Sequence, residues 1–275
     1  MIERYRRQRK MEETLTERLR RMADRLISER PSDRVLNFTL DDQKYWIKRK
    51  LGNGRNQLVK YSVEKEFYYE IARMTIAGRN NPDLVPEIEV LTPDYMVTKD
   101  GGPTVKNWLD SDKSEAEKEL ILEEAGAALA ALHKNGIVHG RPALRDITWN
   151  DGVIHFLDWE NRMYSQDPAT QKALDFILLL QGIYRENYPE ARERADALER
   201  GYVKNGGEET REEARRFLMK HSIVGSLTRQ LAPFKMKDIE SVRKIYDHLL
   251  TGQASCYCPQ GPRLIYLKIE TDRNR

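Results

Sequence analysis

Residues 137–160 constrain the fold more than any other stretch of the sequence. A loop rich in polar groups leads to two short runs of β-branched and aromatic residues, and Asn150-Asp151-Gly152 separates these runs. Such a turn signal between two apolar runs predicts a β-hairpin. Asp146 lies just before the first predicted strand and Asp158 at the end of the second. The hairpin is therefore expected to bring the two carboxylates to one side.

Two carboxylates on one side of a hairpin suit a hard divalent cation. Magnesium binds proteins through one or two carboxylates and leaves its other coordination positions to phosphate oxygens and water. The pattern therefore predicts a magnesium site formed by Asp146 and Asp158.

Upstream of this segment, residues 33–102 predict a small sheet with one helix. Polar and apolar residues alternate in two runs separated by Asp41-Asp42, as in a hairpin. A helical period follows, with Phe67, Ile71 and Met74 on the inward face. The expected elements are strands at 35–40, 43–49, 85–90 and 95–98, and a helix at 62–76.

The rest of the chain predicts a mainly helical unit. Ser114 and Glu117 form a capping box at the start of a helix that Asn135-Gly136 ends. Thr210 with Glu213, and Asp238, mark the starts of later helices. Helices are expected at about 168–184, 209–222 and 238–250. The predicted fold class is thus α+β, with a small β-sheet lobe containing one helix, a larger mainly helical lobe, and a ligand cleft between the two.

The loop and strand around Asp158 resemble the protein-kinase-like fold, in particular the bacterial kinases that phosphorylate Kdo and heptose sugars of the lipopolysaccharide core. Those families carry His-x-Asp-x-x-x-x-Asn in the catalytic loop, followed by a strand that ends in a metal-binding Asp. His139 matches the His, Asp146 stands at the Asn position, and Asp158 matches the metal-binding Asp. The resemblance covers roughly residues 35–185 and implies a two-lobed kinase-like fold that uses ATP and Mg²⁺.

The resemblance also implies roles in nucleotide binding. Lys48, in Tyr45-Trp46-Ile47-Lys48, resembles the lysine that holds the nucleotide phosphates. Glu70 resembles the acid that pairs with this lysine, and Glu66, one turn earlier, is the alternative.

Two further segments fit the same pattern. Residues 95–102 resemble the strand and hinge that hold adenine, with Met96 and Lys99 as cofactor-binding residues. Asp175 resembles the acid on a buried helix that braces the catalytic loop.

The resemblance breaks at Arg141, which stands where these kinases have their catalytic Asp. That Asp accepts the proton of the acceptor hydroxyl, whereas an arginine stays protonated and cannot. Arg141 is expected to contact the γ-phosphate or an anionic acceptor instead, and Glu160 is a candidate replacement base. The predicted catalytic set is Asp146, Asp158, Arg141 and His139, with His139 more a structural hydrogen-bonding residue than a proton shuttle.

Sixteen residues separate Asp158 from Asp175, which leaves no room for a long peptide-docking segment. A small or glycan-like acceptor is therefore expected. The resemblance implies two main functions: a phosphotransferase, or a catalytically inactive pseudokinase that binds a nucleotide or a protein partner. A third, an RNA-associated kinase-like protein, follows from the basic first ten residues.

Charge is unevenly distributed along the chain. The whole sequence has 47 Lys and Arg against 44 Asp and Glu, a balance that disfavours general coating of nucleic acid. Residues 1–30, however, hold ten basic and six acidic side chains. Within them Met11, Leu15, Leu19, Met22 and Leu26 recur at helical spacing. This basic helix either docks on the body by its apolar stripe or contacts anionic lipid or RNA phosphate.

The location predicted from the sequence is cytoplasmic, with peripheral contact at the inner membrane through residues 1–30 as an alternative. No apolar stretch approaches the ~20 residues of a membrane helix, and no signal-peptide pattern is present. Cys256 and Cys258 are too few for a disulfide framework or a metal site. The predicted units are an extension at 1–32, the two lobes at 33–102 and 103–252, and a tail at 253–275.

Overall fold

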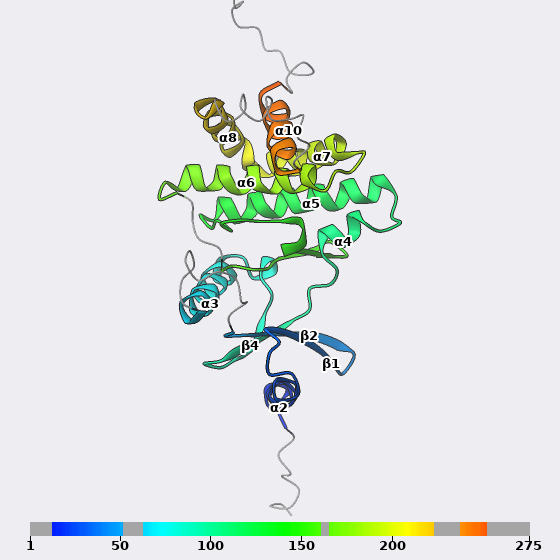
Figure 1. Ribbon diagram of the computed structural model, residues 1–275, viewed down its shortest axis with the longest axis vertical. Helices are drawn as coiled ribbons and strands as arrows, with labels where there is room; N and C mark the ends of the chain where they lie inside the picture. The colour runs from blue at the N-terminus through cyan, green and yellow to red at the C-terminus, as the bar shows by residue number, and fades with distance from the viewer. Residues whose placement is uncertain (1–12, 52–62, 161–164, 223–236, 252–275) are drawn as a thin grey trace, which may run out of the picture.

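The computed structural model describes residues 13–51, 63–160, 165–222 and 237–251. A four-stranded sheet, with helices beside it, lies towards one end of the molecule, and a larger group of helices lies at the other (Figure 1). The predicted α+β class is confirmed. Cys256, Cys258 and the predicted tail lie outside the described residues.

The sheet is antiparallel throughout, with the order β1-β2-β4-β3. Asp41 and Asp42 join the first two strands with φ of 50° and 60°, the left-handed conformation that a two-residue hairpin turn requires. The predicted hairpin is therefore confirmed. The third strand starts three residues later than expected, because a 3₁₀ turn, η1, precedes it. The bounds are β1 Val35–Leu40, β2 Gln43–Arg49, η1 Pro82–Leu84, β3 Ile88–Leu91 and β4 Tyr95–Lys99.

Helix α2 (Leu15–Glu29) covers one face of this sheet. Leu19 and Ala23 are fully buried there, in a cluster with side chains from all four strands. The apolar stripe therefore docks the helix on the body, as one of the two sequence interpretations expected. The basic residues 1–10, on which the lipid or RNA alternative depends, lie outside the described residues.

Helix α3 (Val63–Asn80) belongs to the main core, which extends into the helical part of the molecule. Phe67 and Met74 are buried in this core, as predicted. The chain then passes through Gly101 to the helical part, and this glycine lies so close to a second hairpin that a Cβ on it would be 2.5 Å from Thr148 Oγ1. That second hairpin consists of β5 (Ile147–Asn150) and β6 (Val153–Phe156).

The helical part is built around two long helices, α5 and α6 (Figure 1). The capping box of Ser114 and Glu117 begins α5 as predicted. The box predicted at Thr210 is wrong, because α8 already begins at Glu208 and Thr210 lies inside its first turn. Helices α4 and α7 were not predicted. The helices are α4 Val105–Leu109, α5 Glu115–Lys134, α6 Pro168–Arg185, α7 Ala191–Tyr202, α8 Glu208–Lys220 and α10 Lys237–Thr251.

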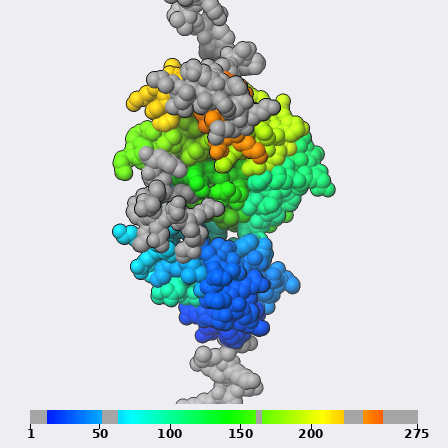
Figure 2. Space-filling view, in the orientation of Figure 1, coloured from blue at the N-terminus to red at the C-terminus, as the bar shows by residue number. Residues whose placement is uncertain are grey.

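Helices α5 and α7 approach each other closely because each carries a glycine at the contact. A Cβ on Gly201 of α7 would overlap the backbone carbonyl of Glu123, and one on Gly126 of α5 would overlap the carbonyl of Leu198. The surface view shows the helices stacked at the end of the molecule opposite the sheet and α2 (Figure 2). Among the described residues, no helix is both long and apolar enough to cross a bilayer.

Candidate functional site

Lys48 of β2 lies at the centre of a cluster of carboxylates. Its Nζ is 2.6 Å from Oε1 of Glu70 on α3, and 3.2 Å from Oδ1 of Asp158, which follows β6. Glu160 adds a third carboxylate at 3.5 Å. The structure thus brings Lys48 together with Glu70, its predicted partner, and with Asp158, the predicted metal ligand. These contacts join the sheet to the segment after the second hairpin.

Opposite charges outweigh burial at the centre of this cluster. Burial alone would lower the pKa of Lys48, but the carboxylates, Glu70 first, raise it. Burial would likewise raise the pKa of Asp158, but Lys48 lowers it below the usual range. Burial dominates at Glu70 and raises its pKa, although Lys48 opposes this. Lys48 and Asp158 are therefore held in their charged forms.

Asp146, at the end of the 3₁₀ turn η2 (Leu144–Asp146), differs from Asp158 in that its pKa is raised rather than lowered. The residue is 8% exposed, and its Oδ2 is buried without a hydrogen-bond partner in the described structure. Arg145 lies 3.6 Å from the other oxygen. Burial, followed by the charge of Asp158, raises the pKa of Asp146 to about 6. A buried polar atom without a partner is unfavourable, so it marks a place where a ligand would be stabilising.

The second hairpin explains why these two aspartates lie near each other. Asp146 directly precedes β5, and its carbonyl accepts a hydrogen bond from the N–H of Leu157, just after β6, at 2.7 Å. Asp158 follows with a φ of 61°, a left-handed conformation that is uncommon outside glycine. Backbone strain of this kind is concentrated at functional sites.

The loop that precedes Asp146 is fixed from α6 by Asp175. The carboxylate of Asp175, which is fully buried, accepts hydrogen bonds from the N–H of His139 at 2.5 Å and of Gly140 at 2.9 Å. The predicted contact between this acid and the loop is present. The imidazole of His139 is fully buried, and its Nε2 lies 2.7 Å from the carbonyl of Leu157. Burial lowers the pKa of His139, which fits a neutral, structural residue.

Two arginines of the site had not been singled out from the sequence. Arg73 donates hydrogen bonds to the carbonyls of Val138 (2.5 Å), His139 (3.1 Å) and Trp159 (3.0 Å). It follows Glu70 by three residues, so both lie on one face of α3, and this spacing was a usable signal. Arg34 pairs with Glu160, and nothing in its local sequence distinguishes it from other charged residues.

The remaining predicted site residues are more scattered. Met96 is 3% exposed within the main core and stands opposite Lys48 in the register of β2 and β4. Lys99 is exposed at the end of β4, and Glu66 is half-buried one turn before Glu70. Arg141 is half-buried and lines a cavity between the loop and α6.

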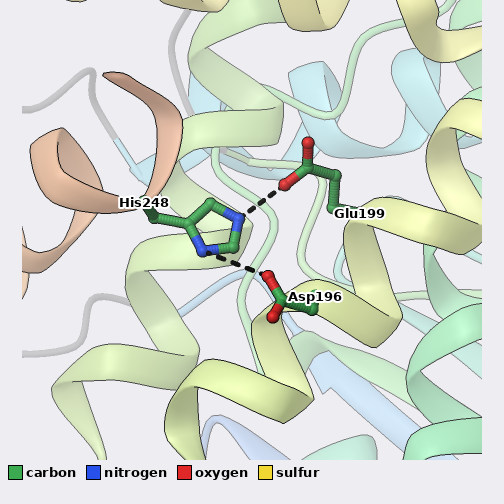
Figure 3. Close-up of side chains that lie close together, drawn as sticks. All are labelled: Asp196, Glu199 and His248. Carbon is green, nitrogen blue, oxygen red and sulfur yellow. Dashed lines mark hydrogen bonds and ion pairs between the residues drawn. The ribbon is translucent and has the colours of Figure 1, made fainter. Parts of the chain in front are cut away.

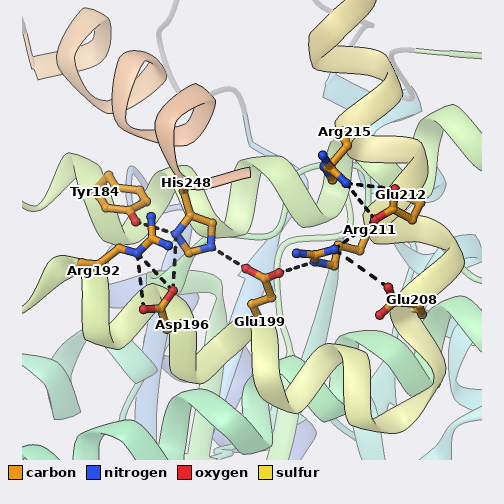
Figure 4. Close-up of polar contacts among 9 residues, drawn as sticks. All are labelled: Tyr184, Arg192, Asp196, Glu199, Glu208, Arg211, Glu212, Arg215 and His248. Carbon is orange, nitrogen blue, oxygen red and sulfur yellow. Dashed lines mark hydrogen bonds and ion pairs between the residues drawn. The ribbon is translucent and has the colours of Figure 1, made fainter. Parts of the chain in front are cut away.

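A second cluster, far along the chain, joins His248 of α10 to Asp196 and Glu199 of α7 (Figure 3). The ligand atoms of these three residues lie within 4.8 Å of one another, as in a metal site. However, Glu199 also pairs with Arg211 and Asp196 with Arg192 (Figure 4). Because arginines already neutralise both carboxylates, we interpret the cluster as a structural ion-pair network. It was not predicted, because His248 is distant in sequence from the two carboxylates.

The sequence has a relative in Haemophilus influenzae (strain ATCC 51907 / DSM 11121 / KW20 / Rd), an uncharacterized protein. The two are 34% identical over 165 residues, which is 58% of this chain and 67% of the relative. The chain belongs to the same family as this Haemophilus protein. No protein-family model matches the sequence.

Proposed function

We propose that the chain is an ATP- and Mg²⁺-dependent phosphotransferase that resembles the kinases of lipopolysaccharide core sugars. The observation that carries the proposal is the buried, unpartnered oxygen of Asp146, next to an Asp158 that is held by Lys48. A metal ion bound by both aspartates would satisfy this oxygen and reduce the repulsion between the two carboxylates.

The charge balance of the site supports a cation of this kind. With Asp146 included, the cluster contains more carboxylates than cationic side chains. The carboxylates are Glu70, Asp146, Asp158 and Glu160, and the cations are Arg34, Lys48 and Arg145. A divalent ion would neutralise the surplus negative charge, and the phosphates of a nucleotide would then be held between this ion and Lys48.

Each residue has a role in this proposal. Bound Mg²⁺ and ATP would supply the phosphoryl group and neutralise its charge. Asp146 and Asp158 would hold the ion, and Lys48 would bind the α- and β-phosphates in the orientation set by Glu70. Asp175 and His139 keep the loop in place through the hydrogen bonds described above.

Catalysis in this site would depend on positioning and charge neutralisation rather than on a strong base, as loose phosphoryl transfer allows. Arg141 cannot accept a proton. Glu160, the candidate replacement base, pairs with Arg34 and lies 3.5 Å from Lys48. Its carboxylate therefore neutralises these two cations.

Arg141 also favours the second candidate, a pseudokinase that binds a nucleotide through the same residues without transfer. Both functions are tested by the thermal unfolding midpoint with ATP and Mg²⁺, and by release or transfer of the γ-phosphate. For the enzyme we expect a rise in the midpoint that EDTA abolishes, together with turnover. Binding without turnover identifies the pseudokinase, and the absence of both rejects the two proposals.

Matched variants distinguish the loss of the proposed metal site from the general effect of removing one negative charge. Asp158→Asn and Asp146→Asn should each remove the Mg²⁺-dependent rise in midpoint and the turnover. Asp151→Asn is the control, since Asp151 is exposed in the turn between β5 and β6. If Asp158→Asn keeps full Mg²⁺-dependent binding, the proposed metal site is wrong.

A further inference from the structure

A cavity of about 190 Å³ lies between the loop that contains Arg141, helix α4 and helix α6. Four cationic side chains line it, together with one carboxylate, Glu186. The cations are Arg141 and Arg145 of the loop, Lys106 of α4 and Arg185 of α6. Like charges repel when they converge on one hollow, so a bound anion would stabilise this lining.

Arg141 differs from the other cations of this cavity. Lys106 pairs with Asp110 at 2.8 Å and with Glu186 at 2.9 Å, and Arg185 pairs with Asp238 at 2.8 Å. Arg141 is half-buried and makes no hydrogen bond or ion pair within the described part of the chain. Its guanidinium group, with five N–H donors in a fixed fork, is therefore open to an oxyanion.

The cavity adjoins the proposed transfer site. Leu144 and Arg145 line it, and Asp146 is the next residue of the same 3₁₀ turn. The charge of Arg141 lowers the pKa of Asp146, although burial and Asp158 outweigh this. A group bound at Arg141 would therefore lie near Asp146, the carboxylate assigned to the metal.

We propose that this cavity binds the phosphate group of a small acceptor, so that the substrate of the enzyme is itself a phosphorylated small molecule. This assignment rests on the proposed phosphotransferase function. A phosphate monoester carries a charge of about −1.5 to −2 at pH 7, so it would pair more strongly with Arg141 than a carboxylate would. The volume is below the ~300–1,000 Å³ of pockets that enclose a drug-sized ligand, so it suits one charged group of the acceptor.

A phosphorylated acceptor would explain why an arginine stands at position 141, where the kinases that the sequence resembles have an aspartate. A carboxylate at this position would repel a phosphorylated acceptor, whereas a guanidinium group attracts it and fixes its orientation by two parallel hydrogen bonds. Arg141 acts in this scheme as a substrate-binding residue, and the γ-phosphate remains with Lys48 and the metal.

The test is a titration of the full-length protein with inorganic phosphate at constant ionic strength. The NMR signals of the arginine Nε–H groups report binding, and the Arg141 signal is assigned from its loss in Arg141→Gln. The titration is run with and without Mg²⁺ and a non-hydrolysable ATP analogue, which fills the nucleotide site and leaves the cavity. Acetate and glucose 6-phosphate are titrated in parallel.

We expect phosphate and glucose 6-phosphate to shift the Arg141 signal saturably, with acetate binding more weakly. Because a charge-assisted hydrogen bond contributes roughly 1.5–3 kcal/mol, Arg141→Gln should weaken phosphate binding by about tenfold or more. Arg216→Gln is the control, since Arg216 is exposed on α8 and pairs with Glu213. It should leave the phosphate affinity unchanged.

Other outcomes separate this inference from the proposed function. Equal phosphate affinity in Arg141→Gln and the wild type overturns the assignment of the cavity. Loss of nucleotide binding in Arg141→Gln, with phosphate binding intact, also overturns it and places Arg141 in the nucleotide site. Saturable phosphate binding at Arg141 in a protein that binds no nucleotide refutes the phosphotransferase and supports the anion site alone.

Discussion

At the scale of a single residue, the buried carboxyl group of Asp146 lowers the free energy of unfolding when it is ionised. Its carboxyl group is buried beside a second carboxylate, and its pKa is raised to about 6. The folded state therefore binds the proton more tightly than the unfolded state, in which the pKa is near 3.8. The free energy of unfolding falls, on account of this residue, as the pH rises from about 4 through 6.

The first prediction concerns this raised pKa. In the metal-free protein, Asp158→Asn should lower the pKa of Asp146, because one of its two causes is removed. Burial is the larger cause and remains, so the pKa should stay above 3.8. Carboxyl ¹³C chemical shifts measured against pH provide the value. Asp151→Asn is the control, and an unchanged pKa in Asp158→Asn would show that the two carboxylates do not interact.

Several residues singled out from the sequence lie together in the structure, among them the predicted pair of Lys48 and Glu70, whereas two arginines of the same region were missed. Lys48, Glu70, Asp158 and Asp175 were located through a resemblance in which order and spacing carry the information. Arg34 was missed because a charged residue just before a strand has no distinctive pattern, and Arg73 was missed although its spacing from Glu70 places both on one face of α3. Their roles depend on which backbone segments lie near them after folding.

At the scale of elements, the sequence predicted best where apolar periodicity or turn residues were strong. The hairpin at Asp41-Asp42 and the capped helix α5 are examples. Helix α7 was missed because its sequence, ARERADALERGY, is strongly polar and its buried face consists largely of small residues. It is stabilised by close approach to α5 through Gly201, a tertiary contact that local pattern does not reveal.

The second prediction tests this close approach. Gly201→Ala places a methyl group against the backbone carbonyl of Glu123, which cannot move without shifting α5. We expect a net loss of roughly 1–3 kcal/mol in the free energy of unfolding, although alanine favours the helix itself. Urea denaturation followed by circular dichroism measures the loss.

Gly78→Ala is the matched control for this substitution. Gly78 also lies in a helix, α3, but its added Cβ would be 3.9 Å from the nearest side chain, an ordinary contact. It should therefore stabilise the protein by up to about 1 kcal/mol. Equal effects of the two substitutions would mean that α5 and α7 are less closely packed than described here.

At the scale of the whole molecule, polar networks fasten parts of the chain that are distant in sequence. His248 of the last described helix contacts Tyr184 of α6 at 2.7 Å and Glu199 of α7 at 2.6 Å. Burial would raise the pKa of Glu199, but hydrogen bonds from His248 and Arg211 outweigh it and lower the pKa to about 2. This network therefore fastens α10 to the rest of the helical part.

The third prediction follows from the lowered pKa of Glu199. Its ordinary pKa is 4.5, so its contribution is fully present above about pH 4.5 and is lost as the pH falls towards 2. The loss amounts to roughly 3 kcal/mol for a shift of this size. Urea midpoints measured by circular dichroism should fall more steeply over this range in the wild type than in Glu199→Gln. Parallel curves for the two proteins would contradict the assignment.

Helix α3 has a consequence for how the two ends of the molecule can move. Through Glu70 it touches the lysine on the sheet, and through Arg73, three residues later, it touches the loop on the helical side. Both contacts come from the same helix, so a rotation of α3 about its axis would displace both of them together. Movement of α3 would then change the surroundings of Lys48 and the conformation of the loop together.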